Sequence, residues 1–183
     1  MVLLHSEKTQ LGISAPDFNL AGVEGKKYSL ASFKDKKVLV IMFICNHCPY
    51  VQAIEDRIIQ LQRHYANQSV QLVGICSNDP TDYPDDSPES LKKRWIEKDY
   101  RFPYLVDETQ EVAKAYGAVC TPDIFVFDSK RQLVYRGQLD NNWKEDHKVT
   151  RHDLQEVIDK LLKGEIPSSD HTPSMGCSIK WKK

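Results

Sequence analysis

Apolar residues occur along this chain in two alternating patterns, short runs and stripes with a helical spacing. An uninterrupted run over 38–44 and a mostly apolar run over 70–75 predict strands that are buried on both faces of a sheet. The residues after the first run are apolar at steps of three and four, which predicts a helix over 49–66. The order strand, helix, strand is typical of an α/β protein.

The rest of the chain continues this alternation. An N-terminal extension over 1–33 contains a predicted hairpin, and residues 165–183 form a C-terminal tail without periodicity. Between them the pattern predicts helices over 88–99, 109–116 and 154–162, a short strand over 102–106, and a hairpin of strands over 124–127 and 133–135. We therefore expect a single α/β domain over 1–183, with a central mixed sheet flanked by helices.

Composition and length exclude several classes of protein. The 183 residues carry 25 Lys and Arg against 26 Asp and Glu, so the net charge of −1 offers no basic surface for nucleic acid. The longest uninterrupted apolar run, Val38 to Cys45, is far shorter than the about 20 residues of a membrane span. The N-terminus has neither the basic region nor the long apolar stretch of a secretory signal, so we expect a cytoplasmic protein with no membrane partner.

Two of the five cysteines stand where the first strand meets the long helix, in the motif Cys45-Asn46-His47-Cys48-Pro49. The first turn of a helix has unpaired N–H groups and a positive dipole end, which favour a thiolate. A separation of three residues on a helix places both side chains on one face, roughly 5–6 Å apart at Cβ. Such a pair can close a disulfide, and so take up and release two electrons.

This motif, in its strand–helix context, resembles the active site of the thioredoxin superfamily. The extension from Ala15-Pro16-Asp17-Phe18 is similar to that of the AhpC/TSA-related peroxiredoxins and the TlpA/ResA-type thiol oxidoreductases. The stretches 45–51, 120–123 and 176–181 are similar to a peroxiredoxin-like group within the superfamily. The resemblance implies a thioredoxin-like fold with an N-terminal β-hairpin extension, and a thiol–disulfide oxidoreductase that needs no cofactor.

The resemblance also implies roles for the residues of the motif. Cys45 would be the exposed nucleophile with a lowered pKa, and would form a mixed disulfide that Cys48 resolves. His47, with Asn46 and Pro49, would tune the redox potential, because an imidazole that donates to the Cys45 thiolate stabilises the reduced form. An exposed His47 without redox effect is the alternative.

The sequence Cys120-Thr121-Pro122 resembles the cis-proline loop of the superfamily. A cis Thr121–Pro122 bond opposite the dithiol would leave the backbone of Thr121 open to an extended substrate, in the manner of strand addition. Cys120 would lie in this substrate-binding segment, unless it is a packed neutral thiol. The implied partners are a disulfide-containing protein or small thiol, and an electron donor such as a thioredoxin or glutathione system.

Two other functions compete with dithiol exchange. An antioxidant thiol peroxidase would need a Pro-x-x-x-Thr/Ser-x-x-Cys motif, but the hydroxyl position falls on Cys45 or Met42, so we rank it second. A non-catalytic module that binds a peptide or a metal ranks third. Pairing the two cysteines with His147 and His152 as a zinc site would need a far longer spacing than the about 12 residues of a zinc finger, so we expect no metal.

The other two cysteines have no assigned role in the sequence. Cys76 ends the second predicted strand, where a buried small hydrophobe is the expected state. Cys177 lies in the C-terminal tail and is either packed or an additional thiol.

Overall fold

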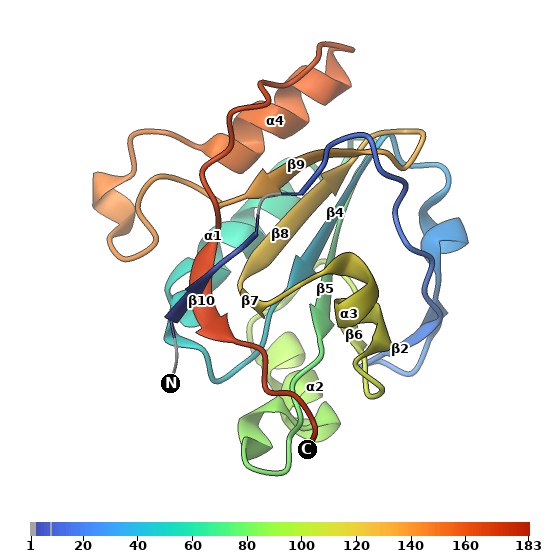
Figure 1. The fold of residues 1–183 in the computed structure, drawn as a ribbon, viewed down its shortest axis with the longest axis vertical. Coiled ribbons are helices and arrows are strands. Elements are labelled where there is room, and N and C mark those ends of the chain that lie inside the picture. Colours follow the sequence, from blue (N-terminus) through green and yellow to red (C-terminus); the bar gives the residue numbers. More distant parts are fainter. Residues whose placement is uncertain (1–2, 8) are drawn as a thin grey trace.

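A seven-stranded mixed sheet with helices on both faces forms the centre of the computed structural model, which describes residues 3–7 and 9–183 (Figure 1). The strand order is β3-β2-β6-β5-β4-β8-β9. The bounds are β2 (Leu20–Gly22), β3 (Lys27–Tyr28), β4 (Val38–Phe43), β5 (Val70–Cys76), β6 (Tyr104–Val106), β8 (Asp123–Phe127) and β9 (Leu133–Gly137). The predicted α/β architecture is confirmed, and the N-terminal hairpin of β2 and β3 joins the sheet because β2 pairs with β6.

Strands β4, β5 and β6 are parallel, and β8 and β9 complete the sheet as an antiparallel hairpin. The helices are α1 (Pro49–His64), α2 (Pro88–Glu97), α3 (Glu111–Tyr116) and α4 (Asp153–Leu162). None of the helices in the described ranges is both long enough and apolar enough to span a membrane.

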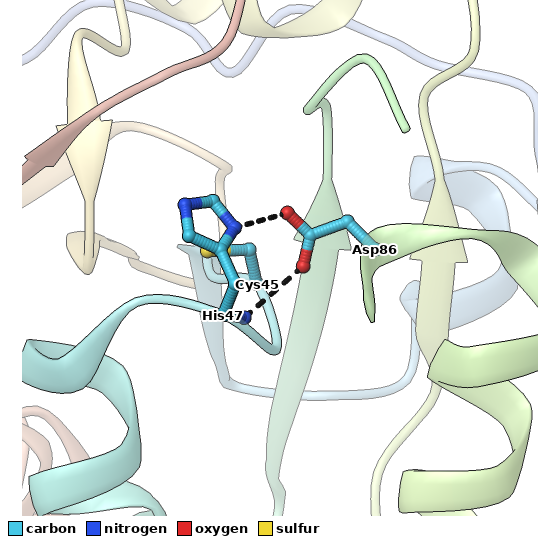
Figure 2. A group of neighbouring side chains, drawn as sticks. All are labelled: Cys45, His47 and Asp86. Atoms are coloured by element: carbon cyan, nitrogen blue, oxygen red, sulfur yellow. Dashed lines mark hydrogen bonds and ion pairs between the residues drawn. The ribbon is translucent and has the colours of Figure 1, made fainter. Parts of the chain in front are cut away.

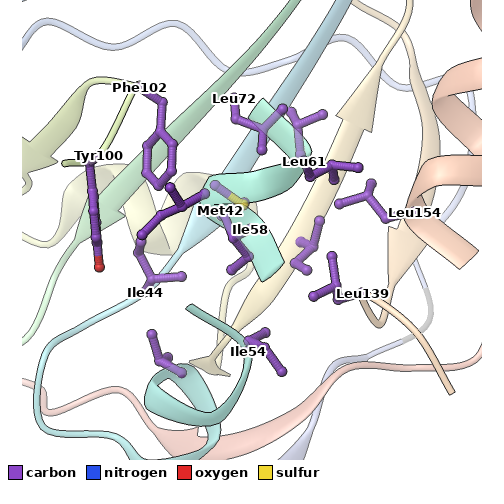
Figure 3. Packing of buried hydrophobic residues seen from close by; sticks show 14 of the residues in the cluster. Met42, Ile44, Ile54, Ile58, Leu61, Leu72, Tyr100, Phe102, Leu139 and Leu154 are labelled. Carbon is purple, nitrogen blue, oxygen red and sulfur yellow. The ribbon is translucent and has the colours of Figure 1, made fainter. Parts of the chain in front are cut away.

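Successive residues of β4 belong to two separate hydrophobic clusters, one on each face of the sheet. Val38, Val40 and Met42 pack with α1 and α4, as the close-up in Figure 3 shows for Met42 beside Ile58. The residues between them pack with α3 on the other face. Every residue of β4 is buried, which confirms the prediction from the apolar run. The strand ends at Phe43, two residues before Cys45.

The C-terminal tail is not irregular throughout, in contrast to the prediction. Residues Met175–Ser178 form β10, the central strand of a second sheet between β1 (Leu3–His5) and β7 (Cys120–Thr121) (Figure 1). A strand of four residues that includes Gly176 has too little periodicity to be recognised locally. Its partners lie at the opposite end of the chain and in the loop before β8, so pairing at long range creates the strand.

Candidate active site

The Cys45-x-x-Cys48 motif forms the loop between β4 and α1 rather than the first turn of the helix. Cys48 is the N-cap of α1, with extended backbone angles, and Pro49 is the first helical residue. The prediction that both cysteines share one helical face is therefore wrong. The helix N-terminus acts on Cys48, whereas Cys45 lies in the loop before it.

Both cysteines of the motif are buried. The exposed fraction is 1% for Cys45 and 0% for Cys48, so the expectation of an exposed Cys45 is wrong. The Sγ atom of Cys45 lies 3.3 Å from the hydroxyl of Thr121, and that of Cys48 lies 3.1 Å from the Thr121 carbonyl oxygen. The bond from Thr121 to Pro122 is cis. The fold thus brings together the motif and the segment that the resemblance singled out.

The two cysteines have opposite pKa shifts. The hydrogen bond from Cys45 is the main cause that lowers the pKa of Cys48, and it outweighs burial, with further contributions from Cys177 and the Val51 N–H. Burial is the main cause that raises the pKa of Cys45, and the hydrogen bond to Cys48 and the charge of Asp86 add to it. These directions are the reverse of the predicted lowered pKa of Cys45.

Asp86 is the principal residue of this site that sequence reasoning missed. Its Oδ1 accepts the backbone N–H groups of Asn46 at 2.8 Å and His47 at 3.2 Å. Its Oδ2 lies 2.5 Å from His47 Nδ1, as Figure 2 shows. The same oxygen accepts the side-chain amide of Asn78 at 2.8 Å. Burial would raise the pKa of Asp86, but the hydrogen bonds from His47 and Asn78 hold it below its ordinary value. The loop between β5 and α2 contains several aspartates, and no local pattern marks this one as buried.

His47 contacts Asp86 instead of donating to the Cys45 thiolate, and it is not an exposed residue either. Its side chain is 10% exposed, and its ring stacks on Tyr83 at 4.6 Å between centroids. Asn46 holds the same loop through its side-chain amide, which donates to the carbonyl oxygens of Asp85 and Ser90. Both residues therefore fix the loop against the segment that leads into α2.

Cys45, His47 and Asp86 also form a group with the donor atoms of a metal site. These atoms lie within 4.8 Å of one another, and no other such group of three occurs among residues 3–7 and 9–183. His147 and His152 do not belong to it, so the alternative zinc site with these two histidines is wrong. A bound ion would have to replace the hydrogen bond between His47 and Asp86.

The predicted substrate-binding segment is not open to solvent. Thr121 is 2% exposed, and in the pairing of β7 with β10 it lies opposite Cys177. Cys120 is fully buried, and burial is the main cause that raises the pKa of its thiol. Its sulfur contacts the Pro122 carbonyl oxygen at 3.6 Å, which is the packed state given as the alternative. The chain's own tail covers the backbone that was expected to pair with a substrate.

Comparison with known proteins places this architecture among redox proteins. The Redoxin family model matches residues 10–158. A structure of an uncharacterized conserved protein from Geobacillus kaustophilus is 44% identical, covers 100% of this chain and 97% of its own, and has a TM-score of 0.94. A hypothetical protein from Sinorhizobium meliloti is 41% identical, with 97% and 98% of the two chains covered and a TM-score of 0.94.

Among curated proteins, the thiol-disulfide oxidoreductase ResA of Bacillus thuringiensis is 27% identical over 134 residues, which are 70% of this chain and 69% of its own. These findings confirm the resemblance to the thioredoxin superfamily. The chain belongs to the Redoxin family of thioredoxin-like oxidoreductases.

Proposed function

We propose that this protein is a thiol–disulfide oxidoreductase in which Cys45 and Cys48 exchange a dithiol for a disulfide. The observation that carries the proposal is the convergence of both sulfurs on Thr121, 3.3 Å from its hydroxyl for Cys45 and 3.1 Å from its carbonyl oxygen for Cys48, with Cys48 at the N-terminus of α1. A thiolate is the attacking species in disulfide exchange, and a second thiol beside it completes the reaction.

The electrostatics favour Cys48 as the attacking sulfur. Its thiolate attacks one sulfur of a substrate disulfide, forms a mixed disulfide and releases the other sulfur as a thiolate. Cys45 then passes its proton to the released thiolate and attacks the Cys48 sulfur. This step releases the second substrate thiol and leaves a Cys45–Cys48 disulfide, so two electrons pass from the protein to the substrate.

The burial of both sulfurs favours a small disulfide over a folded protein as the substrate. Each cysteine is no more than 1% exposed, and β10 covers the backbone of Thr121. A disulfide of glutathione size needs less opening of this cover than a protein loop does. A thiol of the same class, or a thioredoxin, would return the electrons.

Stoichiometric oxidation by glutathione disulfide tests the proposal. We expect the reduced protein to release two molecules of glutathione, and the product to lose two hydrogen atoms. The Cys48→Ala variant should release no glutathione in the time that the wild type needs to react. The Cys76→Ala variant, which removes another buried thiol, should behave as the wild type. A wild-type protein that keeps Cys45 and Cys48 as thiols at equilibrium with excess disulfide would contradict the proposal.

Peroxide reduction is a second candidate, and one contact favours it. The hydroxyl that the linear motif lacks is supplied by Thr121, which lies 3.3 Å from Cys45 Sγ. In that reaction a cysteine thiolate attacks one oxygen of hydrogen peroxide, the O–O bond breaks, and the other oxygen leaves as hydroxide. The sulfenic acid that forms reacts with a neighbouring thiol to give a disulfide and water. Hydrogen peroxide that oxidises the protein faster than equimolar glutathione disulfide, with loss of that rate in Thr121→Val, would favour this candidate.

A further inference from the structure

A third cysteine lies against the proposed dithiol. The Sγ atom of Cys177 in β10 is 3.0 Å from that of Cys48, and Cys177 is 1% exposed. We propose that Cys177 is a third redox thiol of this site, which forms a disulfide with Cys48 in exchange with the Cys45–Cys48 disulfide. This inference rests on the proposed thiol–disulfide function and adds a residue to it.

The tertiary structure holds Cys177 at this position from both sides. In β10 it pairs with Leu3 of β1 and with Thr121 of β7. A side chain on the preceding residue, Gly176, would clash with the carbonyl oxygen of Thr121, so only glycine allows this approach. A disulfide has an S–S length of about 2.0 Å, so closing the bond from the 3.0 Å contact requires a sulfur movement of about 1 Å.

The residues after Cys177 are anchored to the loop that holds the motif. The Lys180 N–H donates to the side-chain oxygen of Asn78 at 2.8 Å, and the Asp79 N–H donates to the Lys180 carbonyl oxygen at 2.8 Å. The amide of Asn78 in turn donates to Asp86, which holds Asn46 and His47. The tail and the motif loop therefore share one hydrogen-bond network.

The place of β10 makes the tail an internal substrate. An extended substrate would pair with the backbone of Thr121 and present a sulfur to the dithiol. In this protein β10 pairs with β7 at Thr121 (Figure 1). The Sγ atom of Cys177 lies 3.0 Å from that of Cys48. Cys48 is thus the central sulfur of three, with one neighbouring thiol from the motif and one from the tail.

The exchange itself is redox-neutral. The Cys177 thiol gives its proton to the leaving sulfur and attacks the Cys48 sulfur of the Cys45–Cys48 disulfide. The bond between Cys45 and Cys48 breaks, the bond between Cys48 and Cys177 forms, and Cys45 leaves as a thiol. Glutathione disulfide can also produce the Cys48–Cys177 disulfide directly, when Cys177 instead of Cys45 resolves the mixed disulfide between Cys48 and glutathione.

The test uses the full-length Cys45→Ala variant, in which the motif disulfide cannot form. After treatment with glutathione disulfide, we expect loss of two hydrogen atoms and a cross-linked peptide pair that contains Cys48 and Cys177. In Cys45→Ala/Cys177→Ala, Cys48 should instead retain one glutathione as a stable mixed disulfide. Adding Cys76→Ala to Cys45→Ala should leave the cross-link unchanged, because Cys76 is a buried thiol at the end of β5 outside the proposed exchange.

A stable glutathione adduct on Cys48 in the single variant, with Cys177 still a thiol, would overturn the inference. It would leave the proposed function intact, provided that the wild type forms the Cys45–Cys48 disulfide. If instead Cys48 reacts with glutathione disulfide in none of these proteins, the proposed function itself fails. Far-ultraviolet circular dichroism of each variant, compared with the wild type, separates both outcomes from a failure to fold.

Discussion

The Nδ1 atom of His47 lies 2.5 Å from Oδ2 of Asp86, although the two residues are 39 positions apart in the sequence. The same carboxylate accepts the backbone N–H groups of Asn46 and His47. The shape of the Cys45-x-x-Cys48 loop therefore depends on a side chain from the segment between β5 and α2. A buried network of this kind resists the loss of any member, because the remaining groups lose their partners.

A double-mutant cycle at this pair should show strong coupling. We expect His47→Phe, which keeps an aromatic ring against Tyr83, and Asp86→Asn each to lower the free energy of unfolding by about 1–3 kcal/mol. The double variant should deviate from additivity by about 0.5–3 kcal/mol, as measured by urea unfolding. The exposed neighbour offers a matched control, since Asp85→Asn should change stability by no more than about 0.5 kcal/mol. Additive effects of the two variants would show that the pair is not coupled.

The pH dependence of stability should carry the signature of Asp86. Its hydrogen bonds hold the folded-state pKa below the ordinary value, so the unfolded chain takes up a proton first as the pH falls. The resulting stabilisation is complete above about pH 4, the unfolded pKa of an aspartate, and is lost as the pH falls through the lower folded pKa. The stability difference between wild type and Asp86→Asn should therefore shrink in acid. A difference that stays constant between about pH 6 and pH 2 would contradict the assignment.

The thiolate of the reduced protein should reside on Cys48. Thiolate absorbance in the ultraviolet should persist well below pH 8.5, about the pKa of an ordinary thiol, because hydrogen bonds lower the pKa of Cys48. Cys48→Ala should abolish this absorbance near neutral pH. Cys45→Ala should raise the midpoint, since it removes the main donor to the Cys48 sulfur, and Cys76→Ala should leave it unchanged. Loss of the signal in Cys45→Ala alone would restore Cys45 as the low-pKa thiol.

Gly176→Ala should separate β10 from β7. The added methyl group would clash with the Thr121 carbonyl oxygen, so the strand must shift away and take Cys177 with it. We expect a loss of about 1–3 kcal/mol in stability, as for other overpacked sites. We also expect faster alkylation of Cys48 by iodoacetamide, because the cover loosens. Ser178→Ala in the same strand is the control, and equal alkylation rates in the two variants would contradict this account.

The sequence by itself determined the order of the strands and helices of the seven-stranded sheet and the position of the dithiol motif. The apolar run of β4 and the helical stripe of α1 are local patterns. The burial of the apolar residues in them can be predicted from their polarity and spacing alone. The helix predicted from residue 88 also begins where the structure has it, at Pro88 after the N-cap Ser87. Such features survive because short-range backbone preferences and hydrophobic periodicity act within one element.

Only the tertiary structure decided what surrounds the two sulfurs of the motif and what covers them. The pKa of a thiol depends on the groups around it and on its burial, and both come from distant segments here. Thr121 and Cys177 lie 73 and 129 positions beyond Cys48, yet both contact its sulfur. The pairing of β10 with β7 and the hydrogen bond from the Asn46 N–H to Asp86 are likewise long-range contacts. No local pattern encodes them, because they arise only when the chain packs as a whole.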